Sequence, residues 1–291
     1  MDAVVGLGTA GCAAAEKFSQ YPQYEVFKIG TDLEPSDRNY LLKTQTSSED
    51  YEKTCPDMGE FFADFNEDTN VTFIVAGGGK IAGASLRILE KIKQCKLNVL
   101  YITPDIALMG GKKYILNRIS FHVLQEYARS GLFDKLTLVY NPSVENILGS
   151  LPVRGYYDAI NSTLVSTIHM VNVFSNTKAV FQNVSESEDH LRICSYGVVN
   201  SDTGEEKMIF PLDNIREKVY YIGISESSLE DGEYFKTLKE RMREKAKEEN
   251  VKISFQINET KYEQNYTYFV AYVDEPQNEN NLKKSLTNDQ G

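Results

Sequence analysis

The sequence predicts an α/β protein: a doubly wound parallel sheet, then a long central helix, then a smaller α+β domain. Two observations support this prediction. Up to about residue 175, short apolar runs rich in β-branched residues alternate with segments of helical periodicity, as in the strand–helix–strand units of a parallel sheet. Beyond about residue 180, strand-like runs surround a single strongly charged helical segment. We therefore expect a first domain over 1–156, the linking helix over 157–176, an α+β domain over 177–273, and a polar, disordered tail over 274–291.

The elements of the first half follow from apolar spacing and from start and stop residues. Expected strands cover 3–6, 24–29, 71–75, 97–102 and 136–140, and each is followed within two residues by Gly, Asn or Pro. Expected helices cover 10–20, 56–66, 84–93, 110–129, 143–148 and 157–174. Pro56 suits the first turn of its helix because its φ is already close to the helical value. The polar segment 33–53 contains Pro35 and is expected to be a long loop.

The second half has a different pattern. Expected strands cover 192–199, 207–210, 219–224, 252–258 and 266–273. The 228–249 segment is helical, and its alternating Glu and Lys are typical of a solvated face, so we expect it to cover one face of the sheet. The strands over 252–258 and 266–273 alternate apolar and polar residues with period two, and we expect them to pair as neighbours.

Composition excludes several function classes. A net charge of −11 and a pI near 4.9 argue against direct nucleic-acid binding, which needs clustered Lys and Arg. No apolar run approaches the roughly 20 residues that cross a bilayer. The four cysteines form no CxxC pair and the three histidines lie far apart, so we expect reduced thiols, no zinc site and a cytoplasmic protein.

Two glycine turns are the main indication of function. The segment Val71–Gly83 reads VTFIVAGGGKIAG, and Met1–Cys12 reads MDAVVGLGTAGC. In both, a short apolar strand runs into glycines and then into a helix. Such turns direct backbone N–H groups and a helix N-terminus at an anion, usually a phosphate. Two of them in one α/β sheet predict a site for a nucleotide.

The first turn on its own allows another interpretation. Gly6, Gly8 and Gly11 satisfy GxGxxG, and Asp32 follows at about the distance of a ribose-binding acid. A dinucleotide-dependent oxidoreductase is therefore an alternative, although no redox pair or hydride-site acid follows in the second half. A P-loop NTPase is disfavoured because GxxxxGK[ST] is absent: Lys80 follows the glycines without a Ser or Thr after it.

The order of the motifs resembles the tubulin/FtsZ superfamily. GTAGC at 8–12 resembles the first nucleotide loop of tubulin, GQAGC, and TCPDMG at 54–59 resembles the end of the third loop. AGGGKIAG at 76–83 stands where the family has GGGTGTG or GGGTGSG. Thr103-Pro104 with GKK at 111–113 resembles the fifth loop, and Asn141-Pro142 the sixth. Asn161 matches the asparagine of the central helix that reads the guanine base.

The resemblance implies a GTP-binding first domain that holds GTP or GDP, with Mg²⁺. The implied nucleotide contacts are Gly8, Thr9, Ala10, Gly11, Cys12, Gly77, Gly78, Gly79, Lys80, Ile81, Ala82, Gly83, Asp105, Asn141 and Asn161. Lys80 and Ala82 replace the hydroxyl residues of the family signature. Asp105 stands in for the ribose-binding glutamate of the fifth loop. An asparagine both donates and accepts hydrogen bonds, which suits a guanine edge.

The loop after the central helix also departs from the family. There the family has NxDFADV, whose acids complete the active site of the neighbouring subunit. Here FQNV at 181–184 resembles FADV with its acid lost. Glu186, Glu188 and Asp189 follow closely, and they are the candidate catalytic acids that would orient water.

The resemblance therefore implies a guanine-nucleotide-binding cytoskeletal protein that assembles head to tail into filaments, most like the short versions carried by bacteriophages or plasmids. Its partner would be itself, with no direct nucleic acid or membrane partner and no identified cargo adaptor. It would act in the cytoplasm of a bacterial host. Two alternatives stay open: a homologue of the same fold that assembles without hydrolysis, and the dinucleotide-dependent oxidoreductase.

Overall fold

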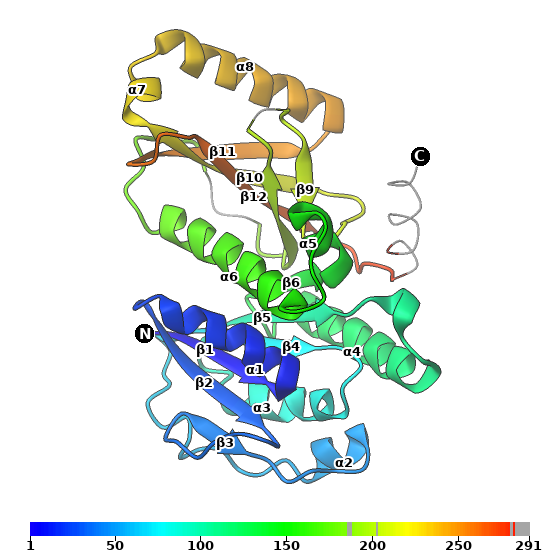
Figure 1. The fold of residues 1–291 in the computed structure, drawn as a ribbon. Coiled ribbons are helices and arrows are strands. Elements are labelled where there is room, and N and C mark those ends of the chain that lie inside the picture. Colours follow the sequence, from blue (N-terminus) through cyan, green and yellow to red (C-terminus); the bar gives the residue numbers. More distant parts are fainter. Residues whose placement is uncertain (185–187, 202, 280–281, 283–291) are drawn as a thin grey trace.

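A computed structural model describes residues 1–184, 188–201, 203–279 and 282. The described residues form one sheet of twelve strands, in the order β3-β2-β1-β4-β5-β6-β8-β12-β10-β11-β7, with β9 paired to β8. Figure 1 shows the N-terminal strands in the lower half, the C-terminal strands in the upper half, and the helix α6 where the two halves meet. The two halves are thus parts of one continuous sheet.

The N-terminal half is a parallel sheet with helices on both faces, as predicted. Its strands are β1 (Asp2–Leu7), β2 (Tyr24–Gly30), β3 (Asn39–Leu41), β4 (Asn70–Ala76), β5 (Lys96–Thr103) and β6 (Lys135–Tyr140). Its helices are α1 (Gly8–Glu16), α2 (Ser48–Lys53), α3 (Ser85–Lys91), α4 (Gly111–Arg129), α5 (Asn141–Leu148) and α6 (Tyr156–Ser175). Short 3₁₀ turns are η1 (Lys17–Gln20), η2 (Lys80–Ala84) and η3 (Ile106–Leu108).

Alternate strand residues enter two separate cores. On β5, Val99 and Tyr101 face the core made with α2, α3 and α4, while Leu100 and Ile102 face the core made with α1, α5 and α6. Because both faces of a parallel sheet are buried, its strands are apolar on both sides. This is why they read as continuous apolar runs in the sequence.

The C-terminal half continues the sheet with mostly antiparallel pairs. Its elements are β7 (Phe181–Gln182), β8 (Ile193–Val199), β9 (Glu206–Met208), β10 (Glu217–Ser225), α7 (Glu226–Leu229), α8 (Gly232–Glu249), β11 (Lys252–Thr260) and β12 (Tyr266–Val273). β8 joins the first half by parallel pairing with β6, where Thr137 lies opposite Cys194. α8 packs on one face, beside Tyr220, and α6 packs on the other, beside Tyr221.

Three local predictions are wrong. Residues 56–66 form turns instead of a helix, because Phe61 and Phe65 pack edge-on against Phe27 of β2 and so fix the backbone from outside the segment. The expected loop over 33–53 contains β3 and α2. Finally, β11 and β12 are not neighbours: β10 lies between them, parallel to β11 and antiparallel to β12. The crossover through α8 makes β10 and β11 a parallel pair, which period-two patterning cannot reveal.

The beginning of the expected disordered tail is packed. Gln277 and Glu279 are 3% exposed and Leu282 is fully buried, which corrects the expectation for these residues. Residues 280–281 and 283–291 lie outside the described part of the chain. Among the described residues, no helix is both long and apolar enough to cross a bilayer.

An ion cluster around the buried Lys218 joins β9, β10 and α8. The Lys218 ammonium, 5% exposed, lies 2.8 Å from Glu206 and 2.6 Å from Glu249. Lys245 lies 2.6 Å from Glu206, and the Tyr220 hydroxyl donates to the same carboxylate at 2.5 Å. Burial would raise the pKa of Glu206, but hydrogen bonds from Lys218, Lys245 and Tyr220 outweigh it and hold the pKa below the ordinary value of 4.5. Ionised Glu206 therefore stabilises the folded state.

Glu206→Gln is expected to lower the free energy of unfolding at pH 7 by about 1.5–3 kcal/mol, because hydrogen bonds to a buried charge are lost. The folded-state pKa is depressed, so this contribution is present above pH 4.5 and is lost as the pH falls below it. The difference from wild type should therefore shrink as the pH is lowered below 4.5. Urea denaturation at each pH measures it. The exposed neighbour Glu205 serves as the control, since Glu205→Gln should change stability by less than about 0.5 kcal/mol. Equal effects of both variants would contradict the assignment.

Candidate functional site

The candidate site lies at the carboxyl ends of the parallel strands. α1 follows β1 directly at Gly8, the second glycine turn follows β4, η3 follows β5, and α5 follows β6. Because these strands are parallel, the segments that follow them gather at one edge of the sheet, where ligands of open α/β sheets bind. The structure thus brings most of the predicted nucleotide contacts to one edge.

The two glycine turns touch each other. Gly8 has φ +73°, and a Cβ built on it would lie 2.6 Å from Ile81 Cγ2. Only glycine combines this left-handed backbone with so close a neighbour. The first turn is therefore seated directly on the second, and both can face the same ligand.

Other residues of the first turn have separate roles. A Cβ on Gly11 would lie 2.5 Å from Ile74 O, so Gly11 lets α1 pack closely on β4. Thr9 and Ala10 are exposed at the start of α1, which has no side-chain N-cap. The Cys12 thiol is buried and hydrogen-bonds Gly6 O at 3.3 Å, and burial raises its pKa to about 11. Cys12 is thus a buried, protonated thiol whose second acceptor is Ile29 O at the end of β2.

The second turn combines buttressed and open positions. A Cβ on Gly77 would lie 1.8 Å from Asn117 Oδ1 and 2.3 Å from the Tyr101 hydroxyl. Gly78 has φ +79° and lies against α4, where its Cβ would be 3.4 Å from Lys113 O. Gly79 is exposed, and its Cβ would meet only Ile81, at 3.9 Å. The turn is therefore tightly packed at Gly77 and Gly78, on the side of α4, and exposed at Gly79.

The last residues of the predicted second loop serve packing. A Cβ on Gly83 would lie 2.1 Å from Ser48 O at the start of α2, and Ala82 is buried. Gly83 therefore permits the close approach of α2 to η2. The residues of this loop that remain accessible to a ligand are Gly78, Gly79 and Lys80.

Cationic side chains surround the open turn. Lys80 is exposed, as are Lys112 and Lys113 in the first turn of α4. No ion pair within the described residues involves any of these three. The N-termini of α1 and α4 add partial positive charge. This arrangement is a local concentration of positive charge in an acidic chain.

The three remaining predicted contacts lie on η3, α5 and α6. Asp105 accepts a hydrogen bond from Ala107 N at 2.9 Å, which caps η3. Burial, and then the nearby Asp105 carboxylate, raise the pKa of Tyr140. Asn141 begins α5 after β6, and Asn161 lies half-buried in the second turn of α6. No side-chain hydrogen bond of Asn161 occurs within the described residues.

The candidate acids lie elsewhere. Arg192 O accepts from Leu136 N at 2.7 Å, at the amino end of β6. Glu188 and Asp189, a few residues before Arg192, are exposed, and Glu188 lies 3.5 Å from His190 Nδ1. They are therefore at the end of the sheet opposite the glycine turns. Glu186 lies outside the described residues.

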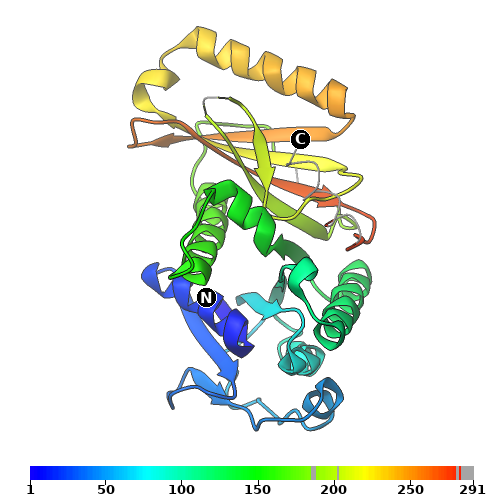
Figure 2. The ribbon, with the colours of Figure 1, turned by 45° about the vertical axis from the view of Figure 1, so that its right-hand side comes forward.

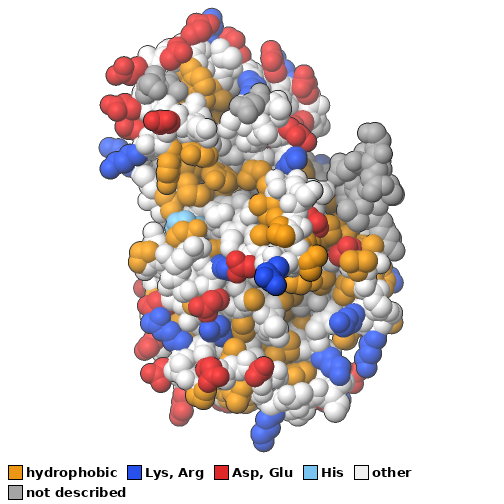
Figure 3. All heavy atoms as spheres, in the orientation of Figure 1, with side chains coloured by type: hydrophobic (Ala, Val, Ile, Leu, Met, Phe, Trp, Pro, Cys, Tyr) orange, Lys and Arg blue, Asp and Glu red, His pale blue; other side chains and the backbone are white. Residues whose placement is uncertain are grey.

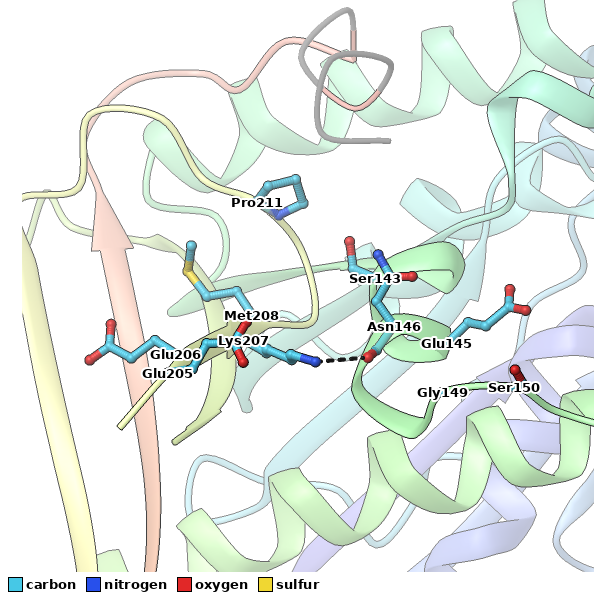
Figure 4. Close-up of a pocket in the computed structure, with 10 residues that line it drawn as sticks. All are labelled: Ser143, Glu145, Asn146, Gly149, Ser150, Glu205, Glu206, Lys207, Met208 and Pro211. Atoms are coloured by element: carbon cyan, nitrogen blue, oxygen red, sulfur yellow. Dashed lines mark hydrogen bonds between the residues drawn. The ribbon is translucent and has the colours of Figure 1, made fainter. Parts of the chain in front are cut away.

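One cavity adjoins the start of α5, with Ser143 in its lining. A pocket of about 660 Å³ lies between α5 and β9. Figure 4 shows its lining, with Lys207 Nζ reaching Asn146 O at 3.2 Å. No cluster of three or more metal-ligating side chains occurs in the part of the chain that the structure describes.

Two residues that support the second turn are absent from the sequence prediction. Tyr101 and Asn117 are fully buried, and the Tyr101 hydroxyl donates to Asn117 Oδ1 at 2.9 Å. The sequence does contain an indication of the role of Asn117, because this residue interrupts the apolar face of α4 formed by Tyr114, Phe121 and Leu124. A polar residue on a buried helical face needs a partner, which marks it for attention.

Gly77→Ala is expected to destabilise the folded protein by about 3 kcal/mol, because its Cβ would overlap the buried Asn117 and Tyr101 side chains. Gly79→Ala is the matched control: it has open space and φ −86°, so stability should change by less than about 0.5 kcal/mol. Chemical denaturation of both variants measures the difference. Equal stabilities would show that Gly77 is not held as described.

Comparisons with known proteins agree on the fold. No family model and no curated protein match the chain by sequence. Among solved structures, TubZ of Bacillus thuringiensis serovar israelensis in a GTPγS-form protofilament has a TM-score of 0.70 at 12% identity, over 99% of this chain and 91% of that one. CetZ2 from Haloferax volcanii, a GTPγS-bound protofilament, has 0.66 at 15% identity, over 93% and 92%. An FtsZ dimer from M. jannaschii has 0.65 at 14% identity, over 94% and 88%. The chain therefore has the tubulin/FtsZ fold.

Proposed function

We propose that the protein binds a guanine nucleotide at the edge formed by its two glycine turns and assembles head to tail into filaments. The observation that carries the proposal is the contact between the turns, Gly8 against Ile81. A phosphate chain needs several backbone amides converging on one point, and two joined turns supply them. Solved structures of the same fold include protofilaments with a GTP analogue bound.

The chain's own groups suit each part of such a nucleotide. Gly8 to Ala10 and Gly78 to Lys80 would hold the phosphates by backbone amides, with the three free lysines neutralising charge. Asp105 lies at the same edge for the ribose hydroxyls. Asn161 would read the guanine base, since its amide offers a donor and an acceptor together. Magnesium would enter with the phosphates.

Head-to-tail assembly fits the placement of the acids. Glu188 and Asp189 lie at the end of the sheet opposite the nucleotide edge, too far to act within one subunit. In a stack of subunits of one orientation, one subunit's acids would face the next subunit's nucleotide. Such heterologous contacts generate open filaments.

Exposed apolar residues support an interface at the nucleotide edge. Leu108 of η3 is 85% exposed, Val153 before α6 is 96% exposed, and Tyr157 is 68% exposed. All three follow the carboxyl ends of β5 or β6. At the other end, Val180 is 58% exposed. Isolated apolar residues are common on surfaces, but the first three are the most exposed large apolar side chains of the described chain, which suits subunit contact.

The first test is right-angle light scattering with GTP, with GDP and without nucleotide, followed by negative-stain microscopy. We expect scattering to rise with GTP only, and filaments to be visible. Gly79→Asp places a carboxylate on the phosphate cradle and should abolish the rise and weaken GTP binding at least 50-fold, with unchanged thermal stability. Gly232→Asp, the same change at an open position on α8, should assemble as wild type. A wild-type chain that binds GTP yet stays monomeric at high concentration would contradict the proposal.

Hydrolysis between subunits is tested by mixing two variants. Replacing Glu186, Glu188 and Asp189 together by Ala should reduce phosphate release at least tenfold while leaving GTP binding intact. Adding Gly79→Asp protein, which retains these acids, should restore phosphate release, because its acids would face the nucleotide of the other variant. Wild-type release by the triple variant alone would show that these acids do not take part. Assembly without any phosphate release, in wild type as well, would favour a non-hydrolysing member of the fold.

A further inference from the structure

A strap at the end of the described chain crosses from the C-terminal half to α4. We define the strap as residues 274–279. Arg216 Nε donates to Asp274 at 3.0 Å, and Asn214 donates to Glu275 at 2.9 Å, which holds the start of the strap on the loop before β10. Figures 1 and 2 both place this red segment beside the green helix α4. The strap thus links the two halves of the molecule.

The strap is bound to α4 by buried polar pairs. Gln277 N donates to Gln125 Oε1 at 2.6 Å, and Gln125 Nε2 returns a hydrogen bond to Gln277 O at 3.2 Å. Two turns earlier on α4, Asn117 Nδ2 donates to Glu279 Oε1. Gln125 and Asn117 are fully buried and Glu279 is 3% exposed. Hydrogen bonds between buried polar groups favour one arrangement, because breaking them leaves costly unpaired groups in the core.

The Asn117 contact continues to the second glycine turn. The Asn117 amide uses its NH₂ for Glu279 and its carbonyl for the Tyr101 hydroxyl, which lies 2.9 Å away. The same carbonyl oxygen occupies the space where Gly77 would carry a Cβ. Burial, and then the Glu279 charge, raise the pKa of Tyr101 far above its usual range, so its hydroxyl remains a donor. The Asn117 side chain therefore contacts both the strap and the turn.

We propose that Glu279 is a positioning residue for the nucleotide site: by fixing the Asn117 amide, it holds the second glycine turn in its ligand-ready form. This rests on the proposed nucleotide binding and adds that the C-terminal strap sets its affinity. Glu279 itself lies beneath the turn and does not reach the open side at Gly79. A strap displaced from α4 would lower affinity without removing any ligand contact.

The test compares three variants in the full chain. Glu279→Ala removes the acceptor of Asn117 and is expected to weaken binding of a fluorescent GTP analogue about tenfold. It should also speed amide hydrogen exchange over 77–80 in the nucleotide-free protein at least tenfold. Glu279→Gln keeps an acceptor oxygen and should restore both to within threefold of wild type. Glu275→Ala, the same truncation at the exposed start of the strap, should leave both within twofold.

The outcomes separate the two proposals. Wild-type affinity and exchange in Glu279→Ala would overturn the positioning role. Equal effects of Glu279→Ala and Glu275→Ala would also overturn it, since the strap would then only stabilise the fold as a whole. Altered exchange in a chain whose wild type binds no nucleotide would sustain positioning and refute nucleotide binding. If Glu279→Ala is insoluble, Glu279→Asp takes its place, because it shortens the same side chain. It is expected to change both measurements about threefold, and unchanged affinity and exchange would overturn the positioning role.

Discussion

The structure depends on close packing against glycines at the carboxyl edge of the parallel sheet. α1 reaches β4 only because Gly11 has no Cβ to meet Ile74 O, and the first glycine turn reaches the second only because Gly8 leaves room for Ile81. Packed interiors do not yield to an extra methyl group without cost. These contacts therefore fix the distance between two sets of backbone amides, which makes the edge suitable for a phosphate chain.

The continuity of the sheet separates the two ends of the molecule. Because β6 pairs with β8 in parallel, the segment that carries Glu188 and Asp189 must enter at the amino end of β6. The glycine turns are at the opposite end of the same strands. Under the proposed function, these acids would therefore act on the nucleotide of a second subunit. Figure 3 shows charged side chains around α8 and apolar ones gathered between α6 and the C-terminal strands on this face.

The polar interior of the molecule divides into two kinds. The cluster of Lys218, Glu206 and Glu249 joins elements within the C-terminal half, and it concerns stability. The chain from Glu279 through Asn117 to Tyr101 joins the C-terminal strap to the glycine turn. Buried polar groups can select a single arrangement of the segments that they join. The Glu279–Asn117–Tyr101 chain joins the strap to the second glycine turn, so the arrangement that it selects includes the candidate site.

The sequence by itself determined the alternation of strands and helices in the first half, the long central helix and the two glycine turns. These are local: apolar period, β-branched runs and glycine position are properties of neighbouring residues. Tertiary structure decided what depends on distant partners. Phe61 and Phe65 pack on Phe27 and override helical propensity, and β10 separates β11 from β12 because of the crossover through α8. The strap was unpredictable for the same reason, since Gln277 and Glu279 look solvated in sequence and are buried only because α4 offers Gln125 and Asn117.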